Sequence, residues 1–579
     1  MKKKICMTLA LAMTVSAVLA GCGVGAKNEG VTETKAVSAE TKADTNKNTD
    51  ASTDANTDTS TNADTSVIYG TPTAPVGTFN PIISYMGSDN LINDLVYSAL
   101  LDMKPDGSLT GSLAESYSVS DDQKTIEFTV HDGVKWHDGE DLTVDDVIFT
   151  LESIAISPDD FSKVSRIEGA ADFRDGKSEH MSGITVDGNK ITIRLTETYA
   201  PFLNKLGRCG IIPKHIWGEI PFEEWGTKTE LLNNPIGSGP YMLTKYNSGE
   251  SVELKAFEDY FEGAPKIETF VLKVVNGDAI AAELSSGNID IVDVKELKNS
   301  EVEDLENEGF VKHSISDDMY QYISFNMRMP IFQDKNLRQA ITYAIDRQSI
   351  LDNIVEGRGS LIGAPFIPGG WAEPAAGELN DYAYNPDKAI ELLEASGWKD
   401  EDGDGIRENK DGEKLQFTLR CSNDSKTREN AVLYVKECLK KVGIDINVSI
   451  EEDSLIADDC IFNHNFEMYA LNCYFSSDPD PYFWWHSDSA TDEPGSGSFN
   501  FGSYKNDDVD KYIIEAENTM DQNERAAYYL KVAKQINEDA PMIFLYVQNR
   551  EIMTNPNLKG FDPGTFNVYY NVANWEMTE

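Results

Sequence analysis

Basic residues are scarce in this sequence. Fifty lysines and arginines stand against 98 aspartates and glutamates, which gives a formal net charge of −48 over 579 residues. A surface of that sign repels the phosphates of DNA, RNA and anionic lipids. We therefore expect no nucleic-acid partner, and the charge instead favours solubility and cationic ligands.

Long apolar runs and paired cysteines are lacking as well. No internal stretch approaches the roughly 18 to 20 apolar residues that a membrane-spanning helix needs. Apart from Cys6 and Cys22 the chain has five cysteines, an odd number with irregular spacing and no CxxC pair. This pattern indicates neither a zinc site nor a disulfide framework, and most of the thiols should be buried among apolar side chains.

Catalytic motifs are also missing. The sequence has no GxSxG or HExxH segment, no P-loop and no GxGxxG pattern, and its seven histidines are scattered. His137 and Asp138 are adjacent, but such a pair in a turn is usually structural. Gly237 and Gly239 could cradle a phosphate, yet they lack the lysine and hydroxyl of a P-loop, so a tight turn is the better interpretation. We expect no enzymatic activity.

The N-terminus has the features of an export signal. Three lysines follow Met1, residues 5–20 are apolar, and the run closes on LAGC at residues 19–22. This tetrapeptide resembles the lipobox of bacterial lipoproteins, which implies removal of residues 1–21 and lipidation of Cys22, for example with palmitate. An ordinary signal peptide with an incidental cysteine is the alternative. Acyl chains on Cys22 would hold the protein at the extracellular face of the cell membrane without spanning it.

Residues 22–66 form a tether in this interpretation. After Cys22 the segment consists mostly of Thr, Asp, Asn, Ala, Lys and Glu, without an aromatic residue. Such a segment cannot bury enough apolar surface to offset the entropy of ordering it, so we expect it to be disordered. Folded structure should begin near Val67.

From Val67 onward the apolar periodicity alternates between strands and helices. Residues 126–130 have the two-residue period of a strand, and Thr143 with Asp146 forms a capping box in front of a helix. Further on, a helix should start at Pro386 and stop at Gly397. The order strand 415–421, helix 426–442, strand 443–450 indicates an α/β lobe in which helices cover a sheet.

Four segments resemble one known family. They are FTVHDGVKWHDGEDLTVDDVIFTLE at 128–152, IIPKHIW at 211–217, NPIGSGPY at 234–241 and GDAIAAELSSGNID at 277–290. All are similar to the family 5 extracellular solute-binding proteins, the peptide- and nickel-type binding proteins of ABC importers. The resemblance covers nearly all of the chain from Val67. It implies the type II periplasmic-binding-protein fold of the large peptide-binding cluster, with two α/β lobes and an extra subdomain in the first.

The resemblance also implies a domain plan. The first lobe should span residues 67–318 and include an inserted subdomain at about 106–233. The second lobe should span 319–542, and residues 543–579 should return to the first lobe. Two strand crossings, near Tyr322–Asn326 and near Ile543–Tyr546, would form the hinge between the lobes.

The stretch from Met468 to His486 contains the candidate binding site. An apolar, strand-like run breaks at Ser476-Ser477 and leads into Asp478 and Asp480, which alternate with two prolines and precede four aromatic residues. Because proline restricts the loop, little loop entropy is lost when a ligand docks on these carboxylates. An ordinary surface turn followed by core aromatics is the alternative.

In peptide-binding members of the family, an aspartate of the second lobe receives the ligand's N-terminal ammonium. The matching region here is Ser477–Pro481, with Asp478 the first choice and Asp480 the second. Further candidates are aromatic walls, partners for a peptide carboxylate and first-lobe contacts. These are, in that order, Tyr474, Phe475, Trp484 and Trp485; Asn423, Lys426 and Arg428; and Phe79 and Asn80. The two tryptophans fit a core role equally well.

An acidic stretch matches the spacing of a calcium loop. Asp400, Asp402, Asp404, Gly405 and Asp411 follow the pattern DxDxDG with an acidic residue at the twelfth position. The closing residue is aspartate instead of glutamate, and clear EF-hand helices are missing from the flanks. A solvated acidic loop is therefore the alternative to a bound calcium ion, and we expect no other cofactor.

Together these features predict a monomeric, lipid-anchored binding protein. It would capture a short peptide and deliver it to the permease and ATPase of an ABC importer. An oligosaccharide is a second candidate ligand, because Trp371, Trp484 and Trp485 could stack on sugar rings, and nickel or a nickel chelate is a third. A receptor that senses a peptide pheromone without importing it, or a secreted hydrolase, would belong to a different functional class.

Overall fold

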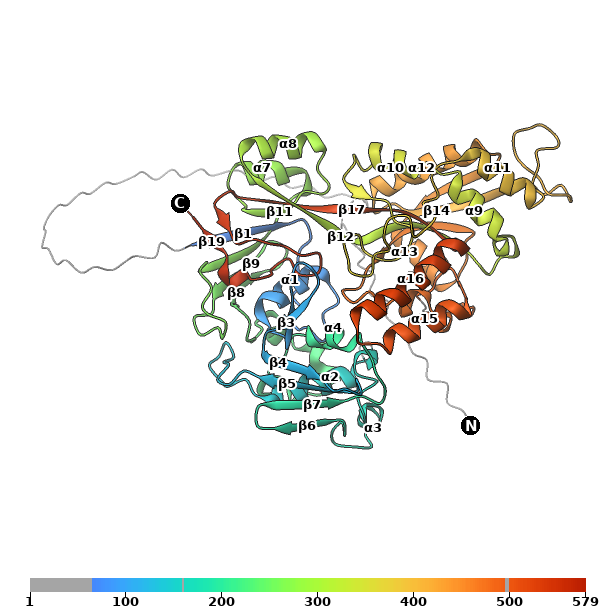
Figure 1. Ribbon diagram of the computed structural model, residues 1–579. Helices are drawn as coiled ribbons and strands as arrows, with labels where there is room; N and C mark the ends of the chain where they lie inside the picture. Colours follow the sequence, from blue (N-terminus) through green and yellow to red (C-terminus); the bar gives the residue numbers. More distant parts are fainter. Residues whose placement is uncertain (1–64, 159–160, 495–498, 579) are drawn as a thin grey trace, which may run out of the picture.

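The computed structural model describes residues 65–158, 161–494 and 499–578. The predicted signal peptide, Cys22 and nearly all of the predicted tether lie outside these ranges. The described chain forms two lobes side by side, with a smaller sheet-bearing subdomain below the first lobe (Figure 1). None of its helices combines the length and the apolar composition that crossing a membrane requires.

One mixed sheet of eleven strands runs through both lobes. Its order is β15-β14-β16-β12-β17-β11-β1-β10-β9-β8, with β13 paired to β17. β1 pairs in parallel with β10 and β11, and β14 pairs in parallel with β15 and β16. The strands are β1 (Ser66–Thr71), β8 (Tyr241–Asn247), β9 (Ser251–Ala256), β10 (Thr269–Val274), β11 (Ile291–Asp293), β12 (Val311–Phe325), β13 (Gly359–Ser360), β14 (Gln416–Ser422), β15 (Asp445–Glu451), β16 (Met468–Tyr474) and β17 (Met542–Thr554).

The first lobe combines one end of this sheet with a small antiparallel sheet of order β4-β5-β7-β6. Asp146 accepts a hydrogen bond from the Thr143 backbone N–H at 2.8 Å, which confirms the capping box predicted in front of α2. The helices are α1 (Gly87–Val96), α2 (Val144–Ile156), α3 (Ala170–Arg174), α4 (Phe202–Gly207), α5 (Lys214–Trp217), α6 (Thr229–Asn233), α7 (Ile280–Ser285) and α8 (Asn299–Glu308). The additional strands are β2 (Leu101–Met103), β3 (Leu109–Gly111), β4 (Ala114–Val119), β5 (Thr125–Val130), β6 (Ile184–Asp187) and β7 (Lys190–Arg194).

Helices cover both faces of the sheet in the second lobe. Side chains alternate along β12, so Ile323 and Phe325 join one core cluster while Tyr320 and Tyr322 join another. Helices α9 to α12 pack on the first face, and α15 and α16 on the second (Figure 1). The helices are α9 (Lys335–Tyr343), α10 (Arg347–Asn353), α11 (Pro386–Ala395), α12 (Lys426–Lys440), α13 (Asp453–Ile456), α14 (Tyr482–Trp485), α15 (Asp507–Glu517) and α16 (Gln522–Asp539). The helix predicted from Pro386 and the strand–helix–strand order predicted over 415–450 are confirmed.

Two antiparallel strands, β12 and β17, pass from one lobe to the other. The first half of β12 pairs with residues 549–554 beside β11, and its second half pairs with residues 542–547 beside β16. The register of this pairing shifts twice, between Ser316 and Tyr320 and again between Gln321 and Tyr322, where the expected crossing at Tyr322–Asn326 begins. Such irregularities bend a strand locally. The hinge itself stays a prediction.

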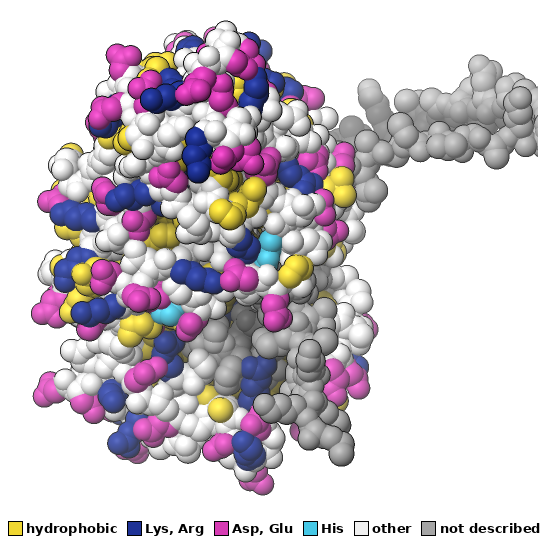
Figure 2. Space-filling model, turned by 90° about the vertical axis from the view of Figure 1, so that its right-hand side faces the viewer, with side chains coloured by type: hydrophobic (Ala, Val, Ile, Leu, Met, Phe, Trp, Pro, Cys, Tyr) yellow, Lys and Arg dark blue, Asp and Glu magenta, His cyan; other side chains and the backbone are white. Residues whose placement is uncertain are grey.

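Surface charges are mixed. Acidic and basic side chains alternate over the face of the molecule shown in Figure 2, and hydrophobic side chains lie there singly or in small groups. Exposed ion pairs such as Lys190–Glu127 are typical of this surface. Pairs of this kind contribute at most about 1 kcal/mol each, so the stability of the fold depends on its buried groups.

The glycine-rich turn at residues 234–241 packs closely against the end of α1. Gly239 N donates to Val96 O at the end of α1, and Gly237 O accepts from His137 N, both at 2.8 Å. The His137 ring joins the two glycines, because its Nδ1 accepts from Gly237 N and its Nε2 donates to Gly239 O. Burial lowers the pKa of His137 to about 4, so the ring is neutral. These contacts confirm the structural role predicted for His137 and the tight turn predicted at Gly237.

Replacing Gly237 by alanine should be strongly destabilising. A Cβ at this position would lie 1.8 Å from Val96 O, a backbone atom that moves only if α1 shifts. We expect Gly237→Ala to lower the free energy of unfolding by about 3 kcal/mol or more, the upper end for overpacked cores. Urea denaturation followed by circular dichroism measures the change. Gly226→Ala is the matched control, since no atom lies within 4 Å of a Cβ there. Equal stability of the two variants would contradict this packing.

Candidate ligand-binding site between the lobes

The candidate loop at residues 475–481 begins where β16 ends, next to the part of β12 where the register shifts. Phe475 N donates to Asp318 O at 2.7 Å, which ties the start of the loop to the irregular part of β12. Within the loop, Asp480 N donates to Asp478 Oδ1 at 3.2 Å, and Tyr482 N donates to Asp480 Oδ1 at 3.1 Å. Aspartates that accept from the backbone two residues on are typical of tight turns. Hydrogen bonds to Asp478 and Asp480 therefore stabilise the turns of the loop.

Asp478 forms a buried ion pair inside the second lobe. Its two carboxylate oxygens accept from Arg525 of α16 at 2.7 and 2.9 Å, and the residue is 4% exposed. Arg525 also donates to Tyr529 Oη at 2.8 Å, and its guanidinium lies 5.2 Å from the centre of the Trp371 ring. The bidentate guanidinium engages one acceptor site on each carboxylate oxygen. The role of Asp478 toward a ligand ammonium stays a prediction.

Asp480 contacts a cation from the other lobe. Its Oδ2 accepts from Lys205 Nζ of α4 at 2.8 Å, and Lys205 also donates to Tyr199 Oη at 2.7 Å. Burial lowers the pKa of Lys205, but Asp480 and Tyr199 outweigh burial and the net pKa is raised, so the lysine is charged. Beside this pair, Ser477 Oγ donates to Asn204 Oδ1 at 2.8 Å. The second-choice aspartate thus binds an ammonium that the first lobe supplies.

A second interlobe pair lies close to the first. Arg166 donates to Glu517 Oε2 at 2.9 Å, and Ala200 N donates to Glu517 O at 2.7 Å. Burial, followed by the charge of Asp480, raises the pKa of Glu517 to about 7, although Arg166 and Lys205 oppose the shift. We call Arg166, Lys205, Asp480 and Glu517 the interlobe charge cluster.

A cavity of about 580 Å³ opens beside these contacts. Its walls come mainly from the first lobe, including α1, α4 and the C-terminal residues 566–574, and the second lobe contributes Ser477. Three carboxylates line it, those of Asp94, Asp102 and Glu262. Burial raises the pKa of all three, that of Asp94 to about 6. The cavity has the size of a small-molecule site, and Ser477 brings the second lobe to its wall.

The predicted aromatic walls divide between core and surface. Trp485 is 3% exposed and packs against Phe544, and Phe475 packs against Tyr320. Trp484 is partly buried, with Phe499 and Phe501 edge-on to its ring, whereas Tyr474 is exposed. None of these four predicted rings is among the described residues that line the 580 Å³ cavity. All four line a separate, small pocket of about 20 Å³, together with Asp480.

The remaining candidates are buried or engaged elsewhere. Phe79 and Asn80 are fully buried in the first lobe, where Asn80 Oδ1 accepts from Ile82 N. Asn423 donates to Glu452 Oε1 at 3.0 Å. Two of the lobe's cationic candidates have acidic or amide partners: Lys426 with Glu429, and Arg428 with Gln321, Asp424 and Asn472. A peptide carboxylate would have to compete with three partners at Arg428, whereas Lys426 keeps 77% of its side chain exposed and has further donors.

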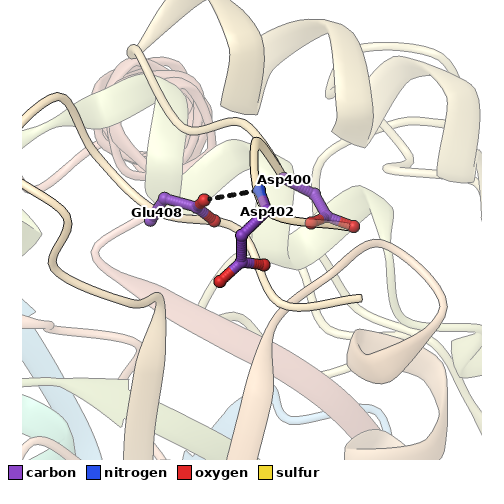
Figure 3. Close-up of side chains that lie close together, drawn as sticks. All are labelled: Asp400, Asp402 and Glu408. Carbon is purple, nitrogen blue, oxygen red and sulfur yellow. Dashed lines mark hydrogen bonds between the residues drawn. The ribbon is translucent and has the colours of Figure 1, made fainter. Parts of the chain in front are cut away.

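The acidic loop that follows α11 brings together a different set of carboxylates from the predicted one. Oxygens of Asp400, Asp402 and Glu408 lie within 4.8 Å of one another, and Glu408 Oε1 also accepts from Asp402 N (Figure 3). Asp400 and Asp402 belong to the predicted calcium loop, whereas Glu408 does not.

Lys414 supplies a positive charge to the same loop. Its Nζ forms ion pairs with Asp404 and, at 3.4 Å, with Asp402, while Asp411 is exposed. Of the four predicted aspartates, Asp400 and Asp402 thus lie together with Glu408, and Asp404 is paired with a lysine. Calcium binding by this loop stays a prediction.

Several residues of the site have no motif in the sequence. Arg525 and Tyr529 are four residues apart, and this spacing could have indicated a shared face of one helix. Nothing in the sequence marks Lys205 as the partner of Asp480, because 275 positions separate them. Arg166 and Glu517 are separated by 351 positions.

The Asp478–Arg525 pair should matter chiefly for stability. In Asp478→Asn the guanidinium stays charged and buried but loses its carboxylate. Breaking a buried pair costs about 3 to 5 kcal/mol, so we expect the free energy of unfolding to fall by that order. Urea denaturation measures it. The double variant Asp478→Asn/Arg525→Met should be more stable than the single one, because no unpaired charge remains. A single variant as stable as the wild type would show that the pair is dispensable.

The Glu517 carboxyl should make stability depend on pH. Its folded pKa of about 7 lies above the ordinary value of 4.5, so the folded state binds this proton more tightly than the unfolded state does. The contribution of Glu517 to stability should therefore rise as the pH falls from about 7 to 4.5, and be lost as the pH rises. Melting temperatures of the wild type and Glu517→Gln between pH 8 and 5 measure it. We expect the steeper rise on acidification in the wild type, and parallel curves would contradict the assignment.

A model of the bacterial extracellular solute-binding proteins, family 5 (Middle), matches residues 108–495 of this chain. The chain is 31% identical to the oligopeptide-binding protein AppA of Bacillus subtilis (strain 168) over 514 residues. This match covers 88% of this chain and 90% of that protein. The match therefore includes both lobes.

Solved structures agree with the sequence match. The structure of Bacillus subtilis AppA in complex with a nonapeptide has a TM-score of 0.71 at 29% identity, and the match covers 89% of this chain and 99% of that one. The structure of NikZ from Campylobacter jejuni in complex with Ni(L-His) has a TM-score of 0.70 at 25% identity. That match covers 89% of this chain and 100% of NikZ. The predicted two-lobed α/β fold with an extra subdomain is confirmed. The chain belongs to the family 5 bacterial extracellular solute-binding proteins, the non-enzymatic substrate-binding components of ABC transporters.

Proposed function

We propose that this protein captures short peptides between its lobes and delivers them to the permease and ATPase of an ABC importer. In this proposal it acts as a monomer on the outer face of the cell membrane, where a lipid on Cys22 anchors it. The observation that carries the proposal is the 580 Å³ cavity, walled mainly by the first lobe and touched by Ser477 of the second, with carboxylates in its wall. The ammonium and N–H groups of a peptide are donors that such a wall can accept. Bacillus subtilis AppA, whose structure holds a nonapeptide, supports the ligand class.

Closure depends on contacts that exist only when the lobes meet. Lys205–Asp480 and Arg166–Glu517 each join one side chain from each lobe. A ligand between the lobes adds contacts to both walls in the closed form, so it shifts the population toward closure. Bending at the irregularity of β12 permits this movement, and the transporter then distinguishes loaded from empty protein by shape.

The positions of the tryptophans favour a peptide over an oligosaccharide. Stacking on a sugar requires an open ring face in the cavity. Trp371 lies against the Arg525 guanidinium, Trp485 is in the core, and Trp484 packs against Phe499. These rings do not line the 580 Å³ cavity, and the two pockets that Trp484 and Trp485 do line are only about 20 Å³ each, too small for a sugar ring.

Ligand that remains bound during purification should reveal the substrate class. We expect mass spectrometry of untagged protein without its signal peptide to find a mixture of short, intact peptides. Calorimetry with a tetrapeptide library should give binding, and X-ray scattering should show a smaller radius of gyration once the library is added. Maltotetraose and nickel with histidine serve as controls and should change neither quantity. Binding of a control compound in place of peptides, or cleavage of the peptides, would contradict the proposal.

A further inference from the structure

Three carboxyl groups and two cations lie together where β12 passes between the lobes. Lys295 donates to Asp317 Oδ2 at 2.9 Å, and Arg550 donates to Asp293 Oδ2 at 3.1 Å. Among the residues that the structure describes, no lysine or arginine forms an ion pair with the third carboxyl group, that of Asp318. The cluster therefore holds one carboxyl group more than it has cations.

The surplus carboxyl group of Asp318 is bonded to the residue before it. The Asp318 backbone N–H donates to Asp317 Oδ1 at 3.0 Å, and a further hydrogen bond joins the two carboxyl groups. An ionised carboxylate only accepts hydrogen bonds, so a bond between two carboxyl groups requires a proton on one of them. Two carboxylates that share a site also repel each other, and one of them then takes up a proton more readily.

Burial acts in the same direction. Asp317 is 6% exposed, and Asp318 is partly buried. Burial, followed by the charge of Asp317, raises the pKa of Asp318 to about 7, although Arg550 and Lys295 oppose the shift. At neutral pH the Asp318 carboxyl is therefore close to half protonated, whereas an exposed aspartate is ionised.

The other titratable and charged groups around the pair have partners of their own or are exposed. From the first lobe and β17 they are Tyr69, Glu296, Arg358 and Glu551, and from the 475–481 loop they are Asp478 and Asp480. Of these six, Glu296 is the exposed one. The surplus charge of Asp318 is thus left to be neutralised by a proton.

Both lobes contact the aspartate pair. Lys295 and Arg550 approach it from the first lobe, beside β11, whereas Asp318 O accepts from Phe475 N of the candidate loop at 2.7 Å. The two aspartates lie between Ser316 and Tyr320, in the stretch of β12 where the register first shifts. Movement of one lobe relative to the other would change the surroundings of both carboxyl groups.

We propose that this stretch of β12 is a proton-linked switch, in which Asp317 and Asp318 share one proton while the lobes are together and release it to solvent when the lobes separate. The inference rests on the proposed function and adds that the pH of the medium sets how tightly the peptide is held.

The sign of the effect follows from the cause of the shift. Burial is the largest cause of the raised pKa of Asp318, so admitting water when the lobes separate lowers that pKa toward its ordinary value of 3.8. The closed form therefore binds the proton more tightly than the open form does. Acid favours closure, and alkali favours opening.

X-ray scattering of the mature chain without ligand tests the switch. The pKa of Glu517 is raised as well, so the parent protein is Glu517→Gln, which removes that contribution. We expect the radius of gyration of the parent to decrease between pH 8 and pH 6. That of Glu517→Gln/Asp318→Asn should be small at both, because the asparagine N–H donates to Asp317 as the protonated carboxyl does.

Peptide affinity gives a second measurement. A group with a pKa of about 7 in the closed form and 3.8 in the open form weakens binding about tenfold between pH 6 and pH 8. In calorimetry with the tetrapeptide library, the parent should lose about tenfold more affinity over this range than Glu517→Gln/Asp318→Asn does. Titration of the peptide amine affects both variants equally and cancels in the comparison.

Two further variants in the same parent are matched controls. Asp304→Asn removes an exposed carboxylate of α8 and should keep the full pH dependence of the parent. Asp318→Ala removes the carboxyl without replacing its hydrogen bond and should abolish the Asp318 contribution, as Asp318→Asn does. Melting curves confirm that both Asp318 variants are folded.

The outcomes distinguish the switch from the function on which it rests. A pH dependence that Asp318→Asn and Asp318→Ala remove, in either measurement, supports the switch. If both measurements change with pH equally with and without Asp318, or change in neither, the switch is overturned, and binding of the peptides leaves the proposed function in place. If no peptide binds while the radius of gyration depends on pH through Asp318, the proposed function fails and the switch stands.

Discussion

Opposite charges meet in pairs where the two lobes touch, and the site is arranged around them. Lys205 and Arg166 come from the first lobe, and Asp480 and Glu517 come from the second. Any of these charges would be expensive to bury alone, so the closed arrangement is stable only when both lobes present their half. Each of the two pairs therefore joins the lobes at the candidate site.

Two neighbouring aspartates of the candidate loop pair with cations from different places. Asp478 is bound to Arg525 within its own lobe. Asp480 reaches across to Lys205 of the first lobe. The large excess of acidic residues in the sequence does not show which aspartates form buried pairs. Most of that charge is exposed on the surface, where it is screened and contributes little.

Local features of the fold could be predicted from the sequence, and long-range pairs could not. The capping box of Thr143 and Asp146 and the helix that starts at Pro386 depend on neighbours within a few positions, so their residues are sufficient evidence. The resemblance to a known family supplied the two lobes. It also suggested Asp478 for the ligand ammonium, which stays a prediction, but nothing in the loop marks Arg525, 47 positions further along, as the partner of this aspartate. The acidic loop at 400–411 shows the same limit, since spacing suggested four aspartates and the fold brought Glu408 and Lys414 to them.

The place of β17 in the sheet constrains the order in which the protein can fold. This strand is one of the last in the chain, yet it lies between β12 and β11. Trp575 and Tyr569, near the C-terminus, belong to the same core cluster as Val67 and Phe79 near the start. A nascent chain emerges from its amino end, so the lobe that appears first must wait for the residues that appear last. Loss of a short C-terminal segment would consequently remove part of the core around Val67 and Phe79. The second lobe is built mostly from one continuous stretch and does not depend on that segment.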